Sequence, residues 1–279
     1  MTTEEIIRQS ILEDVGNGDH SSLACIDVNH QGAMKLLVKQ DGILSGVEVA
    51  KQVLHIVDPD IKMEQFMHDG ESVKKGDIVF IIRGSVQHML TAERTVLNFM
   101  QRMSGIATST HRYVEMVKGT HTTILDTRKT TPNMRYFEKY AVKTGGAQNH
   151  RFGLFDMVML KDNHIDFAGG IEKAIDQTHT YLKEKNLNIK IEIETRTMDE
   201  VKRVMAHGGV DRIMLDNFTP EQIREALQLI NGKYETEASG GITEKNLRTY
   251  AETGVDFISV GALTHQIQSL DLSLKFCEK

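Results

Sequence analysis

The chain has 279 residues, of which 40% are hydrophobic and 26% charged, and its formal net charge is −6 at pH 7. This length can bury a sizeable core in one large or two smaller domains, and the composition is ordinary for a globular protein. The acidic balance argues against a broad nucleic-acid-binding surface. No apolar stretch reaches the roughly 18–20 residues of a membrane-spanning helix, so we expect no transmembrane segment.

The two cysteines, Cys25 and Cys277, lie at opposite ends of the chain and form neither a metal-binding spacing nor a disulfide framework. The N-terminal residues, MTTEEIIRQSILEDVG, mix charged and apolar side chains and lack the apolar core of a secretory signal. We therefore expect a reducing, cytoplasmic environment.

The first 110 residues mix helical and strand patterns. The expected elements are helices over 4–14, 47–57 and 87–118, a strand over 33–40, short strands within 62–84, and a loop over 16–22. The pair Ser104–Gly105 is expected to bend or split the long helix. These elements predict an α+β domain with a sandwich-like arrangement over residues 1–110.

From residue 122 onward, apolar strand patterns alternate with helical ones. Strands are expected over 122–127, 155–162, 189–195, 211–217, 234–240 and 257–262, and helices over 133–146, 169–186, 198–208, 219–231 and 243–253. This alternation implies parallel strands with right-handed crossovers. Residues suited to chemistry end every strand, which favours a barrel over an open sheet. We predict an α/β fold with an incomplete βα barrel of about six to seven strands over 111–264.

A cationic cluster lies between Asp126 and His164. Seven Lys or Arg residues against four Asp or Glu residues give this segment a charge of about +3 (7 − 4) in an acidic chain. Any single pair of cations there is most simply a solvated loop. Together they predict a site for a small anion, because Arg offers a planar fork and Lys a compact charge. Its members are Arg128, Lys129, His150, Arg151 and Lys161.

Two further sets end the predicted strands. Ser239, Gly240, Gly241 and Gly261 resemble the phosphate-binding corner of many barrels, although each alone is equally a turn. Glu194 and Asp216 end neighbouring strands, so we expect their carboxylates side by side, where hard oxygen ligands suit Mg²⁺. Glu192, two residues before Glu194, is assigned to the opposite face of its strand.

Two other functions stay open on these residues alone. Lys161 at a barrel strand end is also suited to forming a Schiff base, as in an aldolase. Residues 61–63 followed by 73–77 faintly resemble a biotinyl or lipoyl carrier domain, although their spacing is short for its hairpin repeat.

The chain as a whole resembles the quinolinate phosphoribosyltransferase family. The matching motifs are GNGD (16–19), TAERTVLNFMQRMSGIAT (91–108), DTRKTTP (126–132), EKYAVKTGG (138–146), NHR (149–151), LKDNHI (160–165), IEIE (191–194), MLDN (214–217), EASGGI (237–242) and VGALTH (260–265). Two departures are Asn133 and Ala147, where the family often has Gly.

The resemblance implies transfer of ribose 5-phosphate from phosphoribosyl pyrophosphate to quinolinate, with loss of CO₂, to give nicotinate mononucleotide. It assigns catalysis to Lys129, Lys161, Glu194 and Asp216, and Mg²⁺ to the last two. It assigns quinolinate's carboxylates to Arg94, Arg128, His150, Arg151 and Lys161. The donor's ribose and phosphates go to Lys129, Glu194, Asp216, Ser239, Gly240 and Gly261, and Thr127, Gly241, Val260 and Ala262 complete the substrate-binding set.

The resemblance also implies a homodimer in which Arg94 completes the partner's pocket. A C-terminal helix over 265–279 is expected to join the first domain. Relatives with other substrates leave an alternative, since a molybdenum-transport-linked homologue and nicotinate-specific enzymes share this barrel.

Overall fold

The computed structural model describes residues 1–278 and separates into two compact units. The first unit comprises residues 1–111, 130–146 and those from Leu263 onward. The second unit comprises residues 112–129 and 147–262. The expected barrel domain over 111–264 differs from the second unit, because residues 130–146 and the end residues 111, 263 and 264 belong to the first unit.

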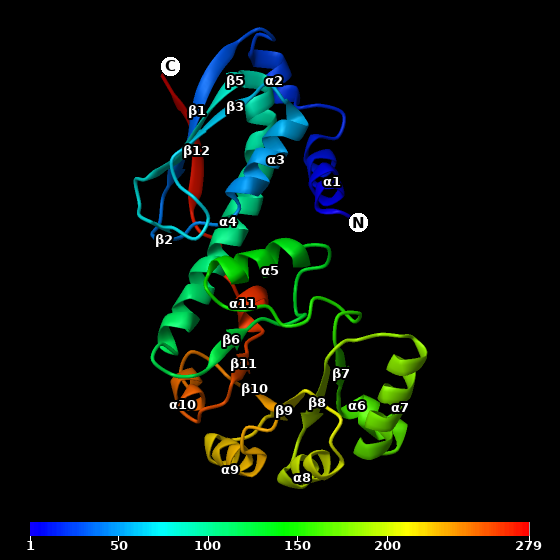
Figure 1. Ribbon diagram of the computed structural model, residues 1–279. Helices are drawn as coiled ribbons and strands as arrows, with labels where there is room; N and C mark the ends of the chain where they lie inside the picture. Colours follow the sequence, from blue (N-terminus) through cyan, green and yellow to red (C-terminus); the bar gives the residue numbers. More distant parts are fainter. Residues whose placement is uncertain (279) are drawn as a thin grey trace. The chain divides into compact units, whose positions relative to one another are not determined.

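The first unit contains an antiparallel sheet in the strand order β12-β1-β5-β3 and a separate β2–β4 pair (Figure 1). Its strands are β1 (Gln31–Val38), β2 (Gly42–Ile43), β3 (Lys62–Gln65), β4 (Ser72–Val73), β5 (Ile78–Ser85) and β12 (Leu272–Cys277). Its helices are α1 (Thr3–Val15), α2 (His20–Cys25), α3 (Val47–Val57), α5 (Arg135–Thr144) and most of α4 (Val86–Met116). The α+β character expected of this part is confirmed.

Helix α4 runs without a break through Ser104 and Gly105, so the expected split is wrong. The two small residues serve close packing instead. The buried Ser104 hydroxyl donates to the Ser45 carbonyl at 3.0 Å and accepts the Ser45 N–H at 2.9 Å. Gly105 lies against the backbone of Gln268 and Ser269, where a Cβ would collide.

The expected C-terminal helix over 265–279 is also wrong for the described residues. A short helix, α11 (Ala262–His265), is followed by strand β12, which pairs with β1. The reason is period-2 alternation: Leu272 and Leu274 are buried, whereas the residues between and after them are more exposed. Residue 279 of that expected helix lies outside the described residues.

The second unit is a six-stranded, all-parallel sheet in the order β6-β11-β10-β9-β8-β7. Its strands are β6 (Thr123–Leu125), β7 (Val158–Leu160), β8 (Ile191–Thr195), β9 (Arg212–Asp216), β10 (Glu235–Ser239) and β11 (Phe257–Ser259). Its helices include α6 (Asp162–Ala168), α7 (Ile171–Glu184), α8 (Met198–His207), α9 (Pro220–Ile230) and α10 (Leu247–Ala251). Only α6 was not expected, and the predicted α/β fold with an incomplete barrel is confirmed.

Strands β6 and β7 form the two edges of this sheet, and an edge-linking segment, residues 147–157, runs from a bridge with β6 to the start of β7. Gln148 makes an isolated parallel bridge to Leu125 of β6. At the other end, Arg151 Nη1 donates to the carbonyl of Met157, which precedes β7, at 3.1 Å. This edge-linking segment therefore fixes the positions of Asn149, His150 and Arg151 relative to both edge strands.

Alternation along the strands separates an apolar face from a polar one. In β8, Ile191 and Ile193 are buried on one face, and Glu192 and Glu194 share the other. The expectation that Glu192 faces away from Glu194 is therefore wrong, because residues two apart on a strand point the same way. The register continues this polar face as Glu192 opposite Arg212 and Arg212 opposite Glu235.

One departure from the family pattern has a local explanation. Asn133 adopts a φ of +64°, a left-handed conformation that Gly takes freely and Asn tolerates better than most residues. Among residues 1–278, no helix is both long and apolar enough to cross a membrane.

Candidate active site

The carboxyl ends of the parallel strands gather most of the candidate residues. Every predicted site residue except Arg94 belongs to the second unit. Arg94 is an exposed residue of α4 in the first unit. The rest follow or end strands β6 to β11, or lie on the edge-linking segment, so their positions are set by one sheet.

Arg128 and Arg151 are two partly exposed arginines, and the positive charge of Arg128 acts on Arg151. Burial lowers the pKa of Arg151, and the positive charge of Arg128 lowers it further. Two arginines of this kind suit an anion with two negative groups, because each offers a planar fork of donors. Nearby in the chain, the Lys129 N–H donates to Thr127 Oγ1 at 3.0 Å, which orders the turn that carries the exposed Lys129 side chain.

Lys161 is the residue directly before helix α6, just after strand β7. Its Nζ lies 3.4 Å from Glu194 Oε2, and roughly half of the Lys161 side chain is exposed. The ammonium group thus connects the cationic residues to the acidic end of β8.

Asp216 and Ser239 form the acidic corner of the site. Ser239 Oγ donates to Asp216 Oδ1 at 2.6 Å, and Asn217 Nδ2 donates to Asp216 Oδ2 at 2.7 Å. Glu194 and Asp216 lie on neighbouring strands, but Glu194 pairs in register with Met214, so Asp216 is two residues further along. The carboxylates are therefore staggered along the strand direction.

The turns after β9 and β10 interlock beside this corner. The Asn217 N–H donates to the Ser239 carbonyl at 2.9 Å, and Gly240 packs against the Asn217 side chain. Gly240 and Gly241 have φ values of +86° and +63°, which side chains disfavour. Ser239–Gly241 thus forms a tight turn that leaves backbone groups close to the strand ends. At the next strand, the Val260 N–H donates to the Leu125 carbonyl at 2.9 Å and ties the start of the Val260–Ala262 turn to β6.

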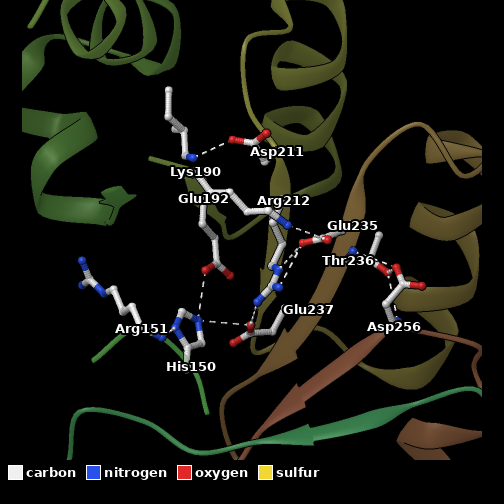
Figure 2. Close-up of polar contacts among 11 residues, drawn as sticks. His150, Arg151, Lys190, Glu192, Asp211, Arg212, Glu235, Thr236, Glu237 and Asp256 are labelled. Atoms are coloured by element: carbon white, nitrogen blue, oxygen red, sulfur yellow. Dashed lines mark hydrogen bonds and ion pairs between the residues drawn. The ribbon is translucent and has the colours of Figure 1, made fainter. Parts of the chain in front are cut away.

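A buried charged layer lies deeper on the same polar face (Figure 2). His150 Nε2 lies 3.0 Å from Glu192 Oε2 and 3.3 Å from Glu237 Oε2. The side chain of His150 is 5% exposed, and both carboxylates are fully buried. Arg212 Nη1 donates to Glu237 at 3.1 Å. These four side chains come from three strands and the edge-linking segment.

Arg212 is itself held on several sides. Its guanidinium donates to Glu235 at 3.0 Å and lies 4.0 Å from the centre of the Phe257 ring. Glu235 in turn accepts from Lys190 at 2.8 Å. Buried charges require such pairing, since an unpaired carboxylate in a low-dielectric interior is strongly unfavourable.

Sequence reasoning found His150 but missed Glu192, Arg212 and Glu237. The signal was present in the strand pattern. Charged residues alternate with apolar ones on β8, β9 and β10, and in a parallel sheet whose other face is covered by helices, the charged face must turn inward. The alternation of these charged residues with apolar ones could therefore have predicted a charged layer beneath the strand ends.

These features define a βα-barrel unit suited to binding small anions at the carboxyl ends of its strands. Known proteins make the class more specific. The model of the quinolinate phosphoribosyl transferase N-terminal domain matches residues 19–104, and that of the C-terminal domain matches residues 106–275.

Individual relatives agree with the domain models. A mitochondrial quinolinate phosphoribosyltransferase (decarboxylating) 2b of Nicotiana tabacum is 43% identical over 98% of this chain and 81% of its own length. A probable nicotinate-nucleotide pyrophosphorylase (carboxylating) of Bacillus subtilis is 39% identical over 97% of this chain and 92% of its own. The crystal structure of NadC from Streptococcus pyogenes has a TM-score of 0.93 at 39% identity, covering 99% of this chain and 97% of that one. The chain therefore belongs to the quinolinate phosphoribosyltransferase family.

Family membership decides between the open alternatives. The first domain, with its short strands, matches the N-terminal domain of this family, so it is not a biotinyl or lipoyl carrier. The second domain matches the C-terminal domain of this family, which is a family of phosphoribosyltransferases. The alternative of a Schiff-base enzyme that uses Lys161 is therefore set aside.

Proposed function

We propose that the protein is a phosphoribosyltransferase that acts on quinolinate. It transfers ribose 5-phosphate from phosphoribosyl pyrophosphate to the pyridine nitrogen and releases pyrophosphate. The carboxyl group at position 2 leaves as CO₂, and the product is nicotinate mononucleotide, a precursor of NAD. The relatives' names support this reaction. The observation that carries it within the chain is that Arg128, Arg151 and Lys161 belong to one unit and follow or adjoin its strand ends, where they suit a dianionic ring.

In this proposal, Arg128, Arg151 and Lys161 receive the two carboxylates of quinolinate, and Arg94 adds a further cation. Lys129 binds phosphate oxygens of the donor. Thr127 lies at the turn that carries it, and Ser239, Gly240, Gly241 and the Val260–Ala262 turn hold the 5-phosphate through hydroxyl and backbone N–H groups. Glu194 and Asp216 face the ribose, where carboxylates stabilise positive charge developing at C1 as the bond to pyrophosphate breaks.

The nucleophile demands little of the protein. The pyridine nitrogen attacks C1 with its own lone pair, so no proton must be removed first. Once it is ribosylated, the ring nitrogen is cationic and stabilises the carbanion left when CO₂ departs. The protein's main contribution is to offset repulsion between a dianion and a polyanionic donor and to align them.

Mg²⁺ is part of the proposal, with Glu194 and Asp216 as its protein ligands, directly or through water. The donor set fits a hard cation, because both residues offer carboxylate oxygens. Ser239 and Asn217 each use one Asp216 oxygen and leave further lone pairs on both. The ion would neutralise charge on the pyrophosphate group.

We further propose a homodimer in which Arg94 of each chain serves the other chain's site, and a cytoplasmic location. The exposure of Arg94 on α4 agrees with a role outside its own unit. Relatives in plants are described as mitochondrial or chloroplastic, so the compartment differs among family members.

The test is incubation of the purified protein with quinolinate, phosphoribosyl pyrophosphate and Mg²⁺, with detection of nicotinate mononucleotide and CO₂. Nicotinate in place of quinolinate is the matched control and should give little product. If quinolinate is not consumed while nicotinate or another aromatic acid is ribosylated, the substrate proposed here is wrong.

A further inference from the structure

His150 differs from the other cationic candidates in its surroundings. Its backbone N–H donates to Asp126 Oδ1 at 2.8 Å, and its side chain points into the buried charged layer rather than toward solvent (Figure 2). The groups facing the ring are Glu192 on β8, Glu237 on β10 and, through Glu237, Arg212 on β9. His150 is therefore surrounded by charges of its own chain.

Each nitrogen of the His150 ring faces groups of the same chain. Nε2 lies within hydrogen-bond distance of one oxygen each of Glu192 and Glu237. Nδ1 accepts the backbone N–H of Arg151 at 2.7 Å. A substrate carboxylate needs a donor, and in this arrangement the ring's donor faces the two buried glutamates.

The contact with Arg151 also settles the tautomer of the ring. Burial opposes a charged His150 ring, whereas Glu192 and Glu237 favour one. The Arg151 N–H also opposes a charged ring, because a proton on Nδ1 would face a second donor 2.7 Å away. We assign the proton to Nε2, where it is shared between the carboxylates, and leave Nδ1 as an acceptor.

We propose that His150 is a positioning residue: it transmits the fixed location of Glu192 and Glu237 to the backbone of Arg151 and so directs the Arg151 guanidinium at the substrate. Arg151 is then held at two points, by its N–H at His150 and by Nη1 at the Met157 carbonyl. A guanidinium fixed in this way loses less entropy on binding a carboxylate. That the anion is quinolinate rests on the proposed function.

The same three residues also suit a metal ion, since their ligand atoms lie within 4.8 Å of one another. Arg212 argues against a metal ion. Its guanidinium, 3.1 Å from Glu237, already neutralises one carboxylate and would repel a divalent ion in the same layer.

A double-mutant cycle between His150 and Arg151 tests the positioning role. His150→Ala should lower kcat/KM for quinolinate about tenfold, as expected for a misaligned charge-assisted hydrogen bond, and chiefly through KM. In an Arg151→Ala background, the same change should cost less than about twofold, because the residue it serves is gone. If His150 contacts the substrate itself, the two losses multiply, and the proposal fails.

Two conservative variants sharpen the test. His150→Asn places an amide oxygen near the position of Nδ1 and should recover most of the lost activity. His150→Gln restores a donor near Nε2 only and should not. Recovery by Gln but not by Asn would overturn the role, and exposed His55→Asn is the control for general effects of the substitution.

A measurement without substrate separates this proposal from the proposed function. In protein labelled with ¹⁵N-histidine, NMR should show His150 at pH 7 with Nε2 protonated and Nδ1 not. A ring protonated on both nitrogens, or a stoichiometric metal ion that Glu192→Gln removes, would overturn the assignment even in a fully active enzyme. If the wild-type protein does not act on quinolinate, the proposed function fails, while the NMR result still decides the tautomer.

Discussion

Two arginine–glutamate pairs in the first unit show how burial changes what an ion pair contributes. Arg102 Nη2 lies 2.6 Å from Glu138, whose side chain is fully buried, and also donates to the Thr131 hydroxyl and the Thr264 carbonyl. Arg83 lies 2.9 Å from Glu64 with both side chains about half exposed. The first pair ties α4 to the start of α5, whereas the second is a surface contact.

We expect Arg102→Met to lower the free energy of unfolding by about 3–5 kcal/mol, because it leaves a buried carboxylate without its cation. The matched change Arg83→Met should cost less than about 1 kcal/mol, since water solvates the remaining carboxylate. Urea unfolding of both variants measures the difference. If the two variants lose the same free energy of unfolding, the buried Glu138 carboxylate does not need Arg102 as its cation.

Asp256 gives a pH-dependent contribution. Burial raises its pKa, but hydrogen bonds from the Thr236 N–H and hydroxyl, together with His121 3.0 Å away, lower it more, so the net shift is downward. A lowered pKa stabilises the fold above the unfolded value of about 3.9, and this stabilisation is lost as the pH falls through the lower folded value.

Asp256→Asn should therefore destabilise the protein at pH 7, and the gap to wild type should narrow below about pH 4 as the wild-type carboxylate is protonated. Unfolding midpoints measured from pH 7 to pH 3 test this. A gap that stays constant over the range would mean that ionisation of Asp256 is not involved.

At the scale of elements, strand β12 owes its place to one apolar face. Leu274 is buried opposite Leu36, whereas Phe276, two residues on, is largely exposed. Leu274→Ala should destabilise the first unit by about 2–4 kcal/mol through lost contacts and a cavity. Phe276→Ala is the control on the same strand and should change stability by less than about 0.5 kcal/mol. Thermal unfolding distinguishes the two.

Much of the second unit could be predicted from the sequence because its strands and helices alternate with clear boundaries. Helix α9 is an example. Thr219 caps its N-terminus and forms a capping box with Gln222, and Pro220 lies in its first turn, so the start of the helix is visible in the sequence. Strand β12 was missed since its partner, β1, lies more than two hundred residues away in the chain. The local signal for this strand was the alternation of Leu272 and Leu274 with more polar residues. The helix was expected instead because the resemblance to the family implied one there.

The candidate site also had a part that the sequence predicted and a part that it did not. Cations and carboxylates at strand ends were found because a strand followed by a charged turn is a local pattern. The layer beneath them depends on which face of each strand turns inward, and Glu192 was placed on the wrong face. Its partners Glu237 and Arg212 come from other strands, so only the sheet order and register bring the three together.

At the scale of the whole molecule, the site residues of one chain are divided between the two units. All are in the second unit except Arg94, on α4 of the first. The proposed dimer predicts that each active site needs Arg94 from one chain and Lys161 from the other.

Arg94→Ala and Lys161→Ala should each reduce phosphoribosyl transfer at least about a hundredfold, because each removes a charged partner of the substrate. When the two inactive proteins are mixed and allowed to exchange chains, one of the two sites in each mixed dimer keeps both residues. Statistical mixing makes half of the dimers mixed, so activity should return to about a quarter of the wild-type level.

The control is a mixture of Arg94→Ala with a double Arg94→Ala, Lys161→Ala chain, which has no intact site in any pairing. Mixtures that stay inactive, although native mass spectrometry shows mixed dimers, would mean that Arg94 serves its own chain.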